Sequence, residues 1–348
     1  MSINTTSFEP DEKFLIFGQY EDWYEKFYAI VPFTDHLIVA GCLTIMMPVG
    51  IIGNLFSIYI FLSAKSLRTP SNLLLMNLSV IDFIMIVSNS PMMFISSLKE
   101  EWVFGKQGCD IYGALTSFGG IGSIIALTII SYDRYIMICF ATEAARIAKI
   151  SRSIKLMIFG WAYTSVFAIL PLAGVGGFIL DGFRTSCTFD YASHSANRRS
   201  FLIFMYLMVF VVPVSLNIYC YFNIFDTVKN AGVSTSGPKE TSKDKRTMQK
   251  ELAIAKVGLT CVMLFLFAWV PYASMALAGQ IFGPEILPPR VSTYPALFAK
   301  SACIYNPIIY ALSHPRFKHE MRKAIPCMSK PSQSFTTQGG STVRTKGN

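Results

Sequence analysis

Seven stretches of about 20 apolar residues constrain the fold of this chain more than any other feature. They lie near residues 36–62, 72–97, 109–139, 154–178, 201–226, 253–280 and 292–312. About 20 apolar residues are what an α-helix needs to cross the hydrocarbon core of a bilayer. Composition agrees, because 52% of the 348 residues are hydrophobic and only 15% are charged. We therefore predict an all-α membrane protein, a seven-transmembrane helix bundle held in a lipid bilayer.

The distribution of charge predicts how this bundle is oriented. Lys and Arg follow the first, third and fifth apolar stretches, whereas the first 35 residues carry seven acids and two lysines. Loops rich in Lys and Arg stay on the cytoplasmic side of a membrane. We expect an extracellular N-terminus without a cleavable signal peptide, and a cytoplasmic C-terminus. The net charge of +9 then belongs to the cytoplasmic face, and no nucleic acid is needed to explain it.

The segments around the bundle carry two candidate modification sites. We expect an extracellular tail at 1–35, the helical bundle at 36–313, an amphipathic cytoplasmic helix at 314–326 and a flexible tail at 327–348. Asn4 begins an Asn-Thr-Thr glycosylation sequon on the predicted outer side. Cys327 directly follows the amphipathic stretch, where a palmitate would anchor the chain to the membrane.

Only two of the eight cysteines reach the oxidising side in this topology. Cys109 lies at the outer end of the third stretch, and Cys187 lies in the loop between the fourth and fifth. Disulfides form in such compartments, so we predict a bond between these two cysteines.

A single lysine, Lys300, lies near the middle of the seventh stretch, TYPALFAKSACIYNPIIYAL. A lysine at the centre of a membrane helix costs roughly 2.5–3.5 kcal/mol to insert, so such a residue is usually functional. Lys300 is about nine residues from the outer end, roughly 14 Å along a helix, so its side chain cannot reach the headgroups. A desolvated lysine loses its proton readily, becomes a nucleophile and can condense with an aldehyde to a Schiff base.

Other polar residues in the apolar stretches predict contacts between helices. Asp82 cannot face lipid, and we expect it to join Asn54 and Asn306 around water or an ion. At the inner end of the third stretch, Arg134 follows Asp133, and Glu251 lies at the inner end of the sixth. We expect Arg134 to bridge both acids.

An ordered set of motifs resembles the rhodopsin-class G-protein-coupled receptors over about residues 36–325. The motifs are Asp133-Arg134-Tyr135, Cys109 with Cys187, Trp161, Phe267-Ala268-Trp269-Val270-Pro271-Tyr272 and Asn306-Pro307-Ile308-Ile309-Tyr310. Lys300 lies six residues before Asn306 and matches the retinal-binding lysine of animal opsins. His314-Pro315-Arg316 resembles the His-Pro-Lys of invertebrate visual opsins, so the chain is most similar to rhabdomeric, arthropod-like opsins.

The resemblance implies that 11-cis retinal is bound at Lys300 as a protonated Schiff base, which needs a counterion. Asp181 matches the loop glutamate that serves as counterion in invertebrate opsins. An aspartate is one methylene shorter, so we expect Ser186, Tyr112 or a water to lie between it and the imine. The alternatives are an ordinary turn acid at Asp181 and rival counterions at Asp110 and Asp190.

The resemblance also implies the residues that surround the chromophore. We expect Gly119 and Gly120 to leave room for a flat ligand, although aromatic residues at helical spacing are also typical of plain core. The expected lining residues are Met205, Tyr206, Phe210, Trp269 and Tyr272. Asn89 stands where some ultraviolet-sensitive arthropod opsins carry a lysine, and its neutrality predicts a pigment that absorbs visible light.

The implied activity is that of a light-activated receptor, not an enzyme, in a plasma or photoreceptor membrane. Light would act on Trp269, the sixth helix would swing outward, and Arg134 would leave its acids. Tyr221 and Tyr310 would then stabilise an open form that binds a heterotrimeric G protein of the Gq class. Hydroxyls of the tail would be phosphorylated by a receptor kinase for arrestin binding: Ser329, Ser332, Ser334, Thr336, Thr337, Ser341, Thr342 and Thr345.

Three alternatives share part of this pattern. A receptor for a diffusible ligand has no need of Lys300, and a retinal photoisomerase has no need of Asp133, Arg134 and Glu251. A light-driven pump would require a chain of acids along its path, whereas Asp82 is the acid that lies deep in the apolar stretches.

Overall fold

The computed structural model describes residues 31–140, 143, 146–191, 195–233, 242–283 and 286–324. The candidate glycosylation site Asn4 and the candidate palmitoylation site Cys327 lie outside these residues, as do the tail hydroxyls.

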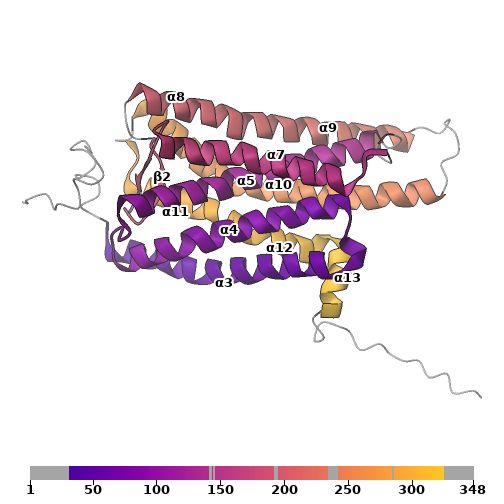
Figure 1. Cartoon of the computed structure of the whole chain (residues 1–348), viewed down its shortest axis with the longest axis horizontal. Coiled ribbons are helices and arrows are strands. Elements are labelled where there is room, and N and C mark those ends of the chain that lie inside the picture. Colours follow the sequence, from indigo (N-terminus) through magenta and orange to yellow (C-terminus); the bar gives the residue numbers. More distant parts are fainter. Residues whose placement is uncertain are drawn as a thin grey trace, which may run out of the picture.

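The described chain forms a bundle of long helices that run side by side (Figure 1). The elements are α3 (Phe33–Ser63), η1 (Lys65–Leu67), α4 (Pro70–Leu98), α5 (Gly105–Cys139), α7 (Ile150–Ile169), η2 (Leu170–Ala173), β1 (Phe178–Asp181), β2 (Ser186–Phe189), α8 (Ala196–Met205), the π-helical η3 (Tyr206–Val211), α9 (Val212–Val233), α10 (Ser242–Phe282), α11 (Pro289–Lys300), α12 (Ala302–Ser313) and α13 (Pro315–Ala324). Six helical segments are each long and apolar enough to cross a membrane, the last being Thr247–Phe282. The seventh crossing follows as α11 and α12, so the predicted all-α seven-helix bundle is confirmed.

The seventh crossing is broken directly after Lys300. The sequence predicts one continuous span over 292–312, whereas the structure has two helices of 12 residues each, separated by Ser301. The Ser301 hydroxyl donates to the carbonyl oxygen of Phe298 at 2.6 Å. A serine hydroxyl that bonds to a nearby carbonyl competes with helical hydrogen bonding, which explains an interruption at this residue.

The outer surface of the bundle is apolar, and its interior holds the polar side chains. Ile45, Ile218 and Phe222 are 67%, 65% and 69% exposed, whereas Asn54 and Arg134 are fully buried. This distribution is expected when the surrounding solvent is hydrocarbon, because polar groups then find partners only inside the bundle.

The two ends of the bundle differ, and we name them by the elements they carry. At the hairpin end, β1 pairs antiparallel with β2, and the predicted disulfide between Cys109 and Cys187 ties β2 to α5. At the α13 end, α13 turns away from α12 and buries Phe317 and Met321. Figure 1 shows β2 and α13 at opposite ends. The expected short amphipathic helix after the last crossing is therefore confirmed.

Candidate functional site

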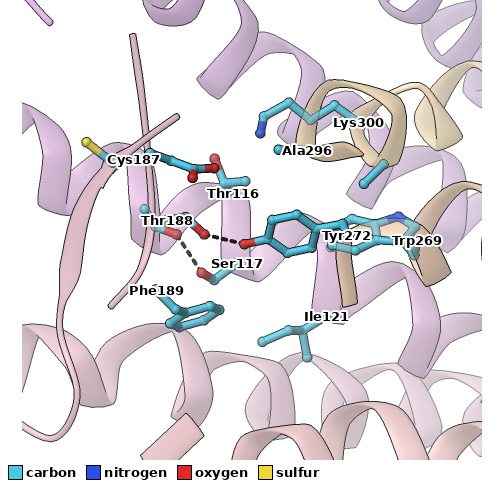
Figure 2. A pocket seen from close by; sticks show the side chains of 14 residues that line it. Thr116, Ser117, Ile121, Cys187, Thr188, Phe189, Trp269, Tyr272, Ala296 and Lys300 are labelled. Atoms are coloured by element: carbon cyan, nitrogen blue, oxygen red, sulfur yellow. Dashed lines mark hydrogen bonds between the residues drawn. The ribbon is translucent and has the colours of Figure 1, made fainter. Parts of the chain in front are cut away.

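Lys300, the last residue of α11, is buried beside a cavity near the hairpin end (Figure 2). The cavity is lined by Gly113, Thr116, Ser117, Gly120 and Ile121 of α5, Asp181 of β1, Cys187, Thr188 and Phe189 of β2, Trp269 and Tyr272 of α10, and Ala296, Ala299 and Lys300 of α11. Figure 2 shows the side chain of Lys300 on the same side of the cavity as Ala296. The amine thus faces a mostly apolar space enclosed by three helices and the hairpin.

The amine of Lys300 has no ion-pair partner within 4.0 Å among the residues that the structure describes. Its Nζ lies 5.9 Å from the centroid of the Tyr112 ring. Asp181 is the acid whose negative charge acts on Lys300 most directly. The amine is therefore neither exposed to water nor neutralised by a direct contact.

Asp181 is held at the cavity by the turn of the hairpin. Gly182 has a φ of 48°, and a Cβ there would lie 1.8 Å from Thr293 Oγ1, so only glycine allows the turn to approach α11 this closely. The Phe183 N–H donates to Thr293 Oγ1 at 2.8 Å. These contacts fasten the turn onto α11 and place the preceding carboxylate beside the cavity.

The pKa of the buried Asp181 carboxyl is set by its burial, a hydrogen bond and a nearby charge. Its side chain is 2% exposed, and the Tyr191 hydroxyl donates to its Oδ1 at 2.7 Å. Burial raises the pKa of the Asp181 carboxyl above its usual value, and the bond from Tyr191 and the charge of Lys300 offset only part of this rise. The protonation state of Asp181 therefore depends on the charge at Lys300.

The other two candidate acids have partners away from the cavity. Asp110 pairs with Lys106, and Asp190 pairs with Arg198. Of the three acids considered from the sequence, only Asp181 lines the cavity.

The two predicted bridging residues lie behind the cavity wall. Ser186 is directly opposite Asp181 in the hairpin register. Tyr112 is fully buried, lies beside Ser186 and donates to Met93 Sδ at 3.7 Å. Neither residue is part of the lining itself.

The two adjacent glycines of α5 face different neighbours. A Cβ on Gly120 would lie 2.3 Å from Trp269 Cη2, at the cavity, whereas a Cβ on Gly119 would lie 2.5 Å from Met85 Cβ on α4. Successive helical residues point about 100° apart, so both cannot face one ligand. Gly120 therefore lines the cavity, whereas Gly119 packs against α4.

The fifth crossing does not contribute to the cavity lining. Met205 and Phe210 pack against the main hydrophobic core instead, and the ring of Tyr206 lies 5.4 Å from that of Phe210. Tyr206 to Val211 form a π-helical turn. A π-turn has more residues per turn than an α-helix, which rotates side chains relative to the positions expected from the sequence.

Trp269 and Tyr272 lie where the sequence predicts, and the hairpin contributes neighbours that the sequence did not indicate. The Tyr272 and Thr188 hydroxyls share a hydrogen bond, and the two hydroxyls face each other in Figure 2. Trp269 Nε1 is buried without a hydrogen-bond partner in the described chain. Thr188 and Phe189 follow Cys187 directly, so the predicted disulfide was the signal that places them over the bundle. Ala296 lies four residues before Lys300, one helical turn away on the same face.

A second cluster of charges lies at the α13 end. Arg134 is fully buried and forms ion pairs with Asp133 and Glu251, and it also bonds the Ser71 hydroxyl. Asp133 Oδ1 accepts a further bond from Arg152 Nη1 at 2.7 Å. Four helices, α4, α5, α7 and α10, are therefore joined through this one cluster.

Among the described tyrosines near this cluster, the one contact between hydroxyls is a weak contact of Tyr135. Its hydroxyl lies 3.5 Å from that of Tyr219. The Tyr310 hydroxyl donates to the carbonyl oxygen of Leu75 at 3.2 Å. The buried Tyr221 hydroxyl has no partner in the described residues and lies against Gly258.

Asp82 forms a smaller polar cluster than the sequence predicts. It accepts from Ser123 at 2.8 Å and from Asn306 at 2.7 Å. Asn54 instead donates to the carbonyl oxygen of Cys303 at 2.9 Å. Pro307, four residues after Cys303, has no N–H to offer this carbonyl, and Asn54 takes its place.

Comparison with known proteins identifies the family. The family described as "7 transmembrane receptor (rhodopsin family)" matches residues 53–310. The chain belongs to this family. It is 32% identical to melanopsin of Phodopus sungorus over 326 residues, which cover 90% of this chain and 70% of that protein. It is 30% identical to melanopsin-A of Danio rerio over 303 residues. This match covers 86% of this chain and 51% of that protein, about half of its length.

The fold comparison agrees with the sequence comparison. The crystal structure of squid rhodopsin matches with a TM-score of 0.82 and 32% identity, over 90% of this chain and 93% of that one. The chain is thus an animal opsin of the rhabdomeric type, a light-activated G-protein-coupled receptor and a multi-pass membrane protein. In this opsin, Lys300 lies at the cavity near the hairpin end, and Arg134 is a buried cation at the α13 end.

Proposed function

We propose that this opsin carries retinal covalently at Lys300, with the 11-cis isomer in the dark, and signals to a heterotrimeric G protein of the Gq class. One observation supports the attachment most strongly. The buried amine of Lys300 faces an apolar cavity and lacks an ion pair in the described chain. Bound retinal would supply the absorption of visible light and a light-driven change of shape.

The residues around the cavity fit a flat, apolar ligand. Gly120 lies against the edge of Trp269, where a larger residue would fill the space. Ile121 and Phe189 add apolar walls. Trp269 Nε1, buried without a partner in the described chain, is a polar atom placed next to this space. We propose that these four residues hold the ring and polyene.

Asp181 is the proposed counterion. A positive charge at Lys300 Nζ would be costly in a buried cavity without an anion nearby. Asp181 lines the cavity, and Tyr191 fixes its carboxylate with a hydrogen bond of 2.7 Å. No direct contact joins Asp181 to Lys300, so a bridging group between them, such as a water, is part of the proposal.

Activation would couple the cavity to the α13 end through α10. Trp269 lines the cavity, Pro271 lies within the same helix, and Glu251 near its other end holds Arg134. Movement of α10 would separate Glu251 from Arg134 and open the α13 end to the G protein. The hydroxyls of Tyr221 and Tyr310 do not bond each other in this structure. In the open state they would come together and stabilise it by bonding each other.

The remaining parts of the proposal concern orientation, partners and chemistry. The hairpin end would be extracellular and the α13 end cytoplasmic, as the distribution of Lys and Arg favours. Glycosylation at Asn4, palmitoylation at Cys327, and binding of arrestin after phosphorylation by a receptor kinase belong to the same proposal. The protein would act as a receptor and not as an enzyme, because Arg134 and both of its acids form the ion pairs that a signalling switch requires.

The decisive experiment is to regenerate the purified full-length protein with 11-cis retinal and trap it with borohydride. We expect a retinal-dependent visible absorption band, and mass spectrometry should find the reduced adduct on the peptide that contains Lys300. Lys300→Ala should abolish the band, whereas Lys256→Ala, an exposed lysine on α10, should keep it. An adduct on another residue, or colour retained covalently in Lys300→Ala, would refute the attachment.

A light-dependent nucleotide-exchange assay with a Gq-class protein tests signalling separately. Exchange that rises on illumination supports a receptor. A pigment that isomerises retinal in light without stimulating any G protein would favour a photoisomerase. A chain that binds no retinal at all would favour a receptor for a diffusible ligand.

A further inference from the structure

Four cations gather in a pocket at the start of α7, outside the ligand cavity. The pocket is lined by Arg146, Ile147, Lys149, Ser151, Arg152, Lys155 and Leu156. Four of these seven lining residues are basic and none is acidic. The described walls of this pocket are therefore strongly positive.

Three of the four cations have no acid near them within the part of the chain that the structure describes. Arg146, Lys149 and Lys155 are exposed and lie more than 4.0 Å from every described carboxylate. Arg152 differs, because its Nη1 donates to Asp133 and its guanidinium lies 5.9 Å from the centroid of the Tyr132 ring. These three cations, exposed and without an ion pair among the described residues, can accept an anion from outside the chain, and the fourth connects the pocket to the Arg134 cluster.

The pocket lies where the apolar outer surface of α7 ends. Ile154, Ile158 and Phe159 of the same helix are 43%, 63% and 62% exposed, as expected for side chains that face hydrocarbon. Lys155 lies one turn before Phe159, on the same side of the helix. An anion in the pocket would therefore sit at the level where lipid chains meet their headgroups.

The start of α7 adds a weaker attraction for anions. Lys149 is the residue that precedes the helix, and its side chain offers no acceptor to the first backbone N–H groups. These groups carry the positive end of the helix dipole. The positive end of the helix dipole and the lysine charges thus attract an anion to the same place.

We propose that this pocket binds the phosphate headgroup of an anionic phospholipid, with the acyl chains along Ile158 and Phe159. Charge complementarity supports a lipid, because clustered Lys and Arg at a membrane surface attract anionic lipids and the adjacent surface is apolar. Arg152 belongs to both the pocket and the Asp133 cluster, so an occupied pocket competes with Asp133 for this guanidinium. The composition of the surrounding lipid would then influence how firmly the α13 end is held.

The test is to titrate the purified full-length protein with phosphatidylserine or phosphatidylcholine and count bound lipids by native mass spectrometry. The variant is Lys149→Gln with Lys155→Gln, since neither lysine touches Asp133. The control is Lys229→Gln with Lys256→Gln, two exposed lysines on α9 and α10 that carry the same charge. No retinal is needed, so failure here leaves the proposed photoreceptor function untouched.

We expect the variant to bind phosphatidylserine roughly tenfold or more weakly, whereas the control and phosphatidylcholine binding should change little. Equal losses in variant and control would overturn the proposal, because they would show general charge attraction. Displacement of phosphatidylserine by inorganic phosphate would show a site for free anions instead. Unchanged lipid binding with weaker G-protein binding in phosphatidylcholine nanodiscs would assign the surface to a protein partner. If the double variant is misfolded on size-exclusion chromatography, Lys155→Gln alone should still give a smaller loss in the same titration.

Discussion

Two cations that are buried in the described part of this opsin have opposite surroundings. At the hairpin end, Lys300 faces an apolar cavity without an ion pair in the described chain. At the α13 end, Arg134 is fully buried and bonded to Asp133, Glu251 and Ser71. Breaking a buried ion pair by removing one partner costs about 3–5 kcal/mol, so a cation like Arg134 holds its helices together. An amine without such a pair contributes no comparable clamp, which agrees with the chemical role proposed for Lys300.

Asp181→Asn should have the largest effect after the loss of Lys300 itself, because it removes the acid that lines the cavity in the described chain. Without this anion, a positive charge at Lys300 Nζ would no longer be stabilised, and the dark absorption band should move from the visible to the ultraviolet at neutral pH. A spectrum of the regenerated variant measures this. Asp190→Asn is the control, since Asp190 pairs with Arg198 away from the cavity. An unchanged visible band in Asp181→Asn would exclude it as counterion.

The α13 end should lose stability in acid because of His314. Burial and the charge of Arg316 lower the pKa of His314 from 6.5 to about 4. The folded chain therefore keeps the imidazole neutral, and its stabilising contribution is complete above pH 6.5 and is lost as the pH falls toward 4. The loss should reach about 2–3 kcal/mol.

Thermal unfolding of the purified protein across this pH range measures the effect. His314→Gln should remove most of the pH dependence between 6.5 and 4, whereas His319→Gln, an exposed residue of α13, should leave it in place. The same dependence in wild type and His314→Gln would assign the acid sensitivity to other groups.

The neighbouring glycines of α5 offer a matched pair that separates cavity from packing. Gly120→Ala would press on Trp269 at the cavity, and Gly119→Ala would press on Met85 of α4. Each should cost about 1–3 kcal/mol of stability, because the core is overpacked. Only Gly120→Ala should also reduce retinal uptake and shift the absorption maximum. Equal spectral changes in both variants would contradict the assignment of Gly120 to the cavity.

Glu251→Gln should weaken the clamp at the α13 end while leaving the cavity intact. A hydrogen bond to a charged group is worth about 1.5 kcal/mol, so the open state and basal nucleotide exchange without light should rise roughly tenfold. Asp226→Asn, an exposed acid on α9, controls for the change in net charge. A normal absorption spectrum with raised basal exchange would show that the ion pairs at the α13 end can be weakened without disturbing the cavity at the hairpin end. Unchanged basal exchange would show that Glu251 does not hold the resting state.

The sequence was sufficient for features that depend on length and composition. The apolar stretches predicted the crossings, and the compartment of Cys109 and Cys187 predicted the disulfide that the structure contains. The isolated charge of Lys300 within an apolar stretch was enough to indicate a site. These signals are robust because they need no knowledge of how the helices are rotated.

Features that depend on helix rotation and on backbone irregularities could not be predicted. Met205 directly precedes the π-helical turn and Phe210 lies within it. Such a turn changes the direction of side chains without a clear mark in the sequence. Asn54 was expected beside Asp82, but it bonds the Cys303 carbonyl that Pro307 leaves without a partner. In both cases a local departure from regular α-helix decided the outcome.

The interruption at Ser301 divides the last crossing into two short helices joined by a single residue. The first helix, α11, ends with Lys300, and the second, α12, carries Asn306, which donates to Asp82 at 2.7 Å. Ser301 itself keeps helical dihedral angles, and its N–H still bonds the carbonyl oxygens of Leu297 and Phe298. A displacement of Lys300 would therefore be passed through this residue to Asn306 and its bond with Asp82.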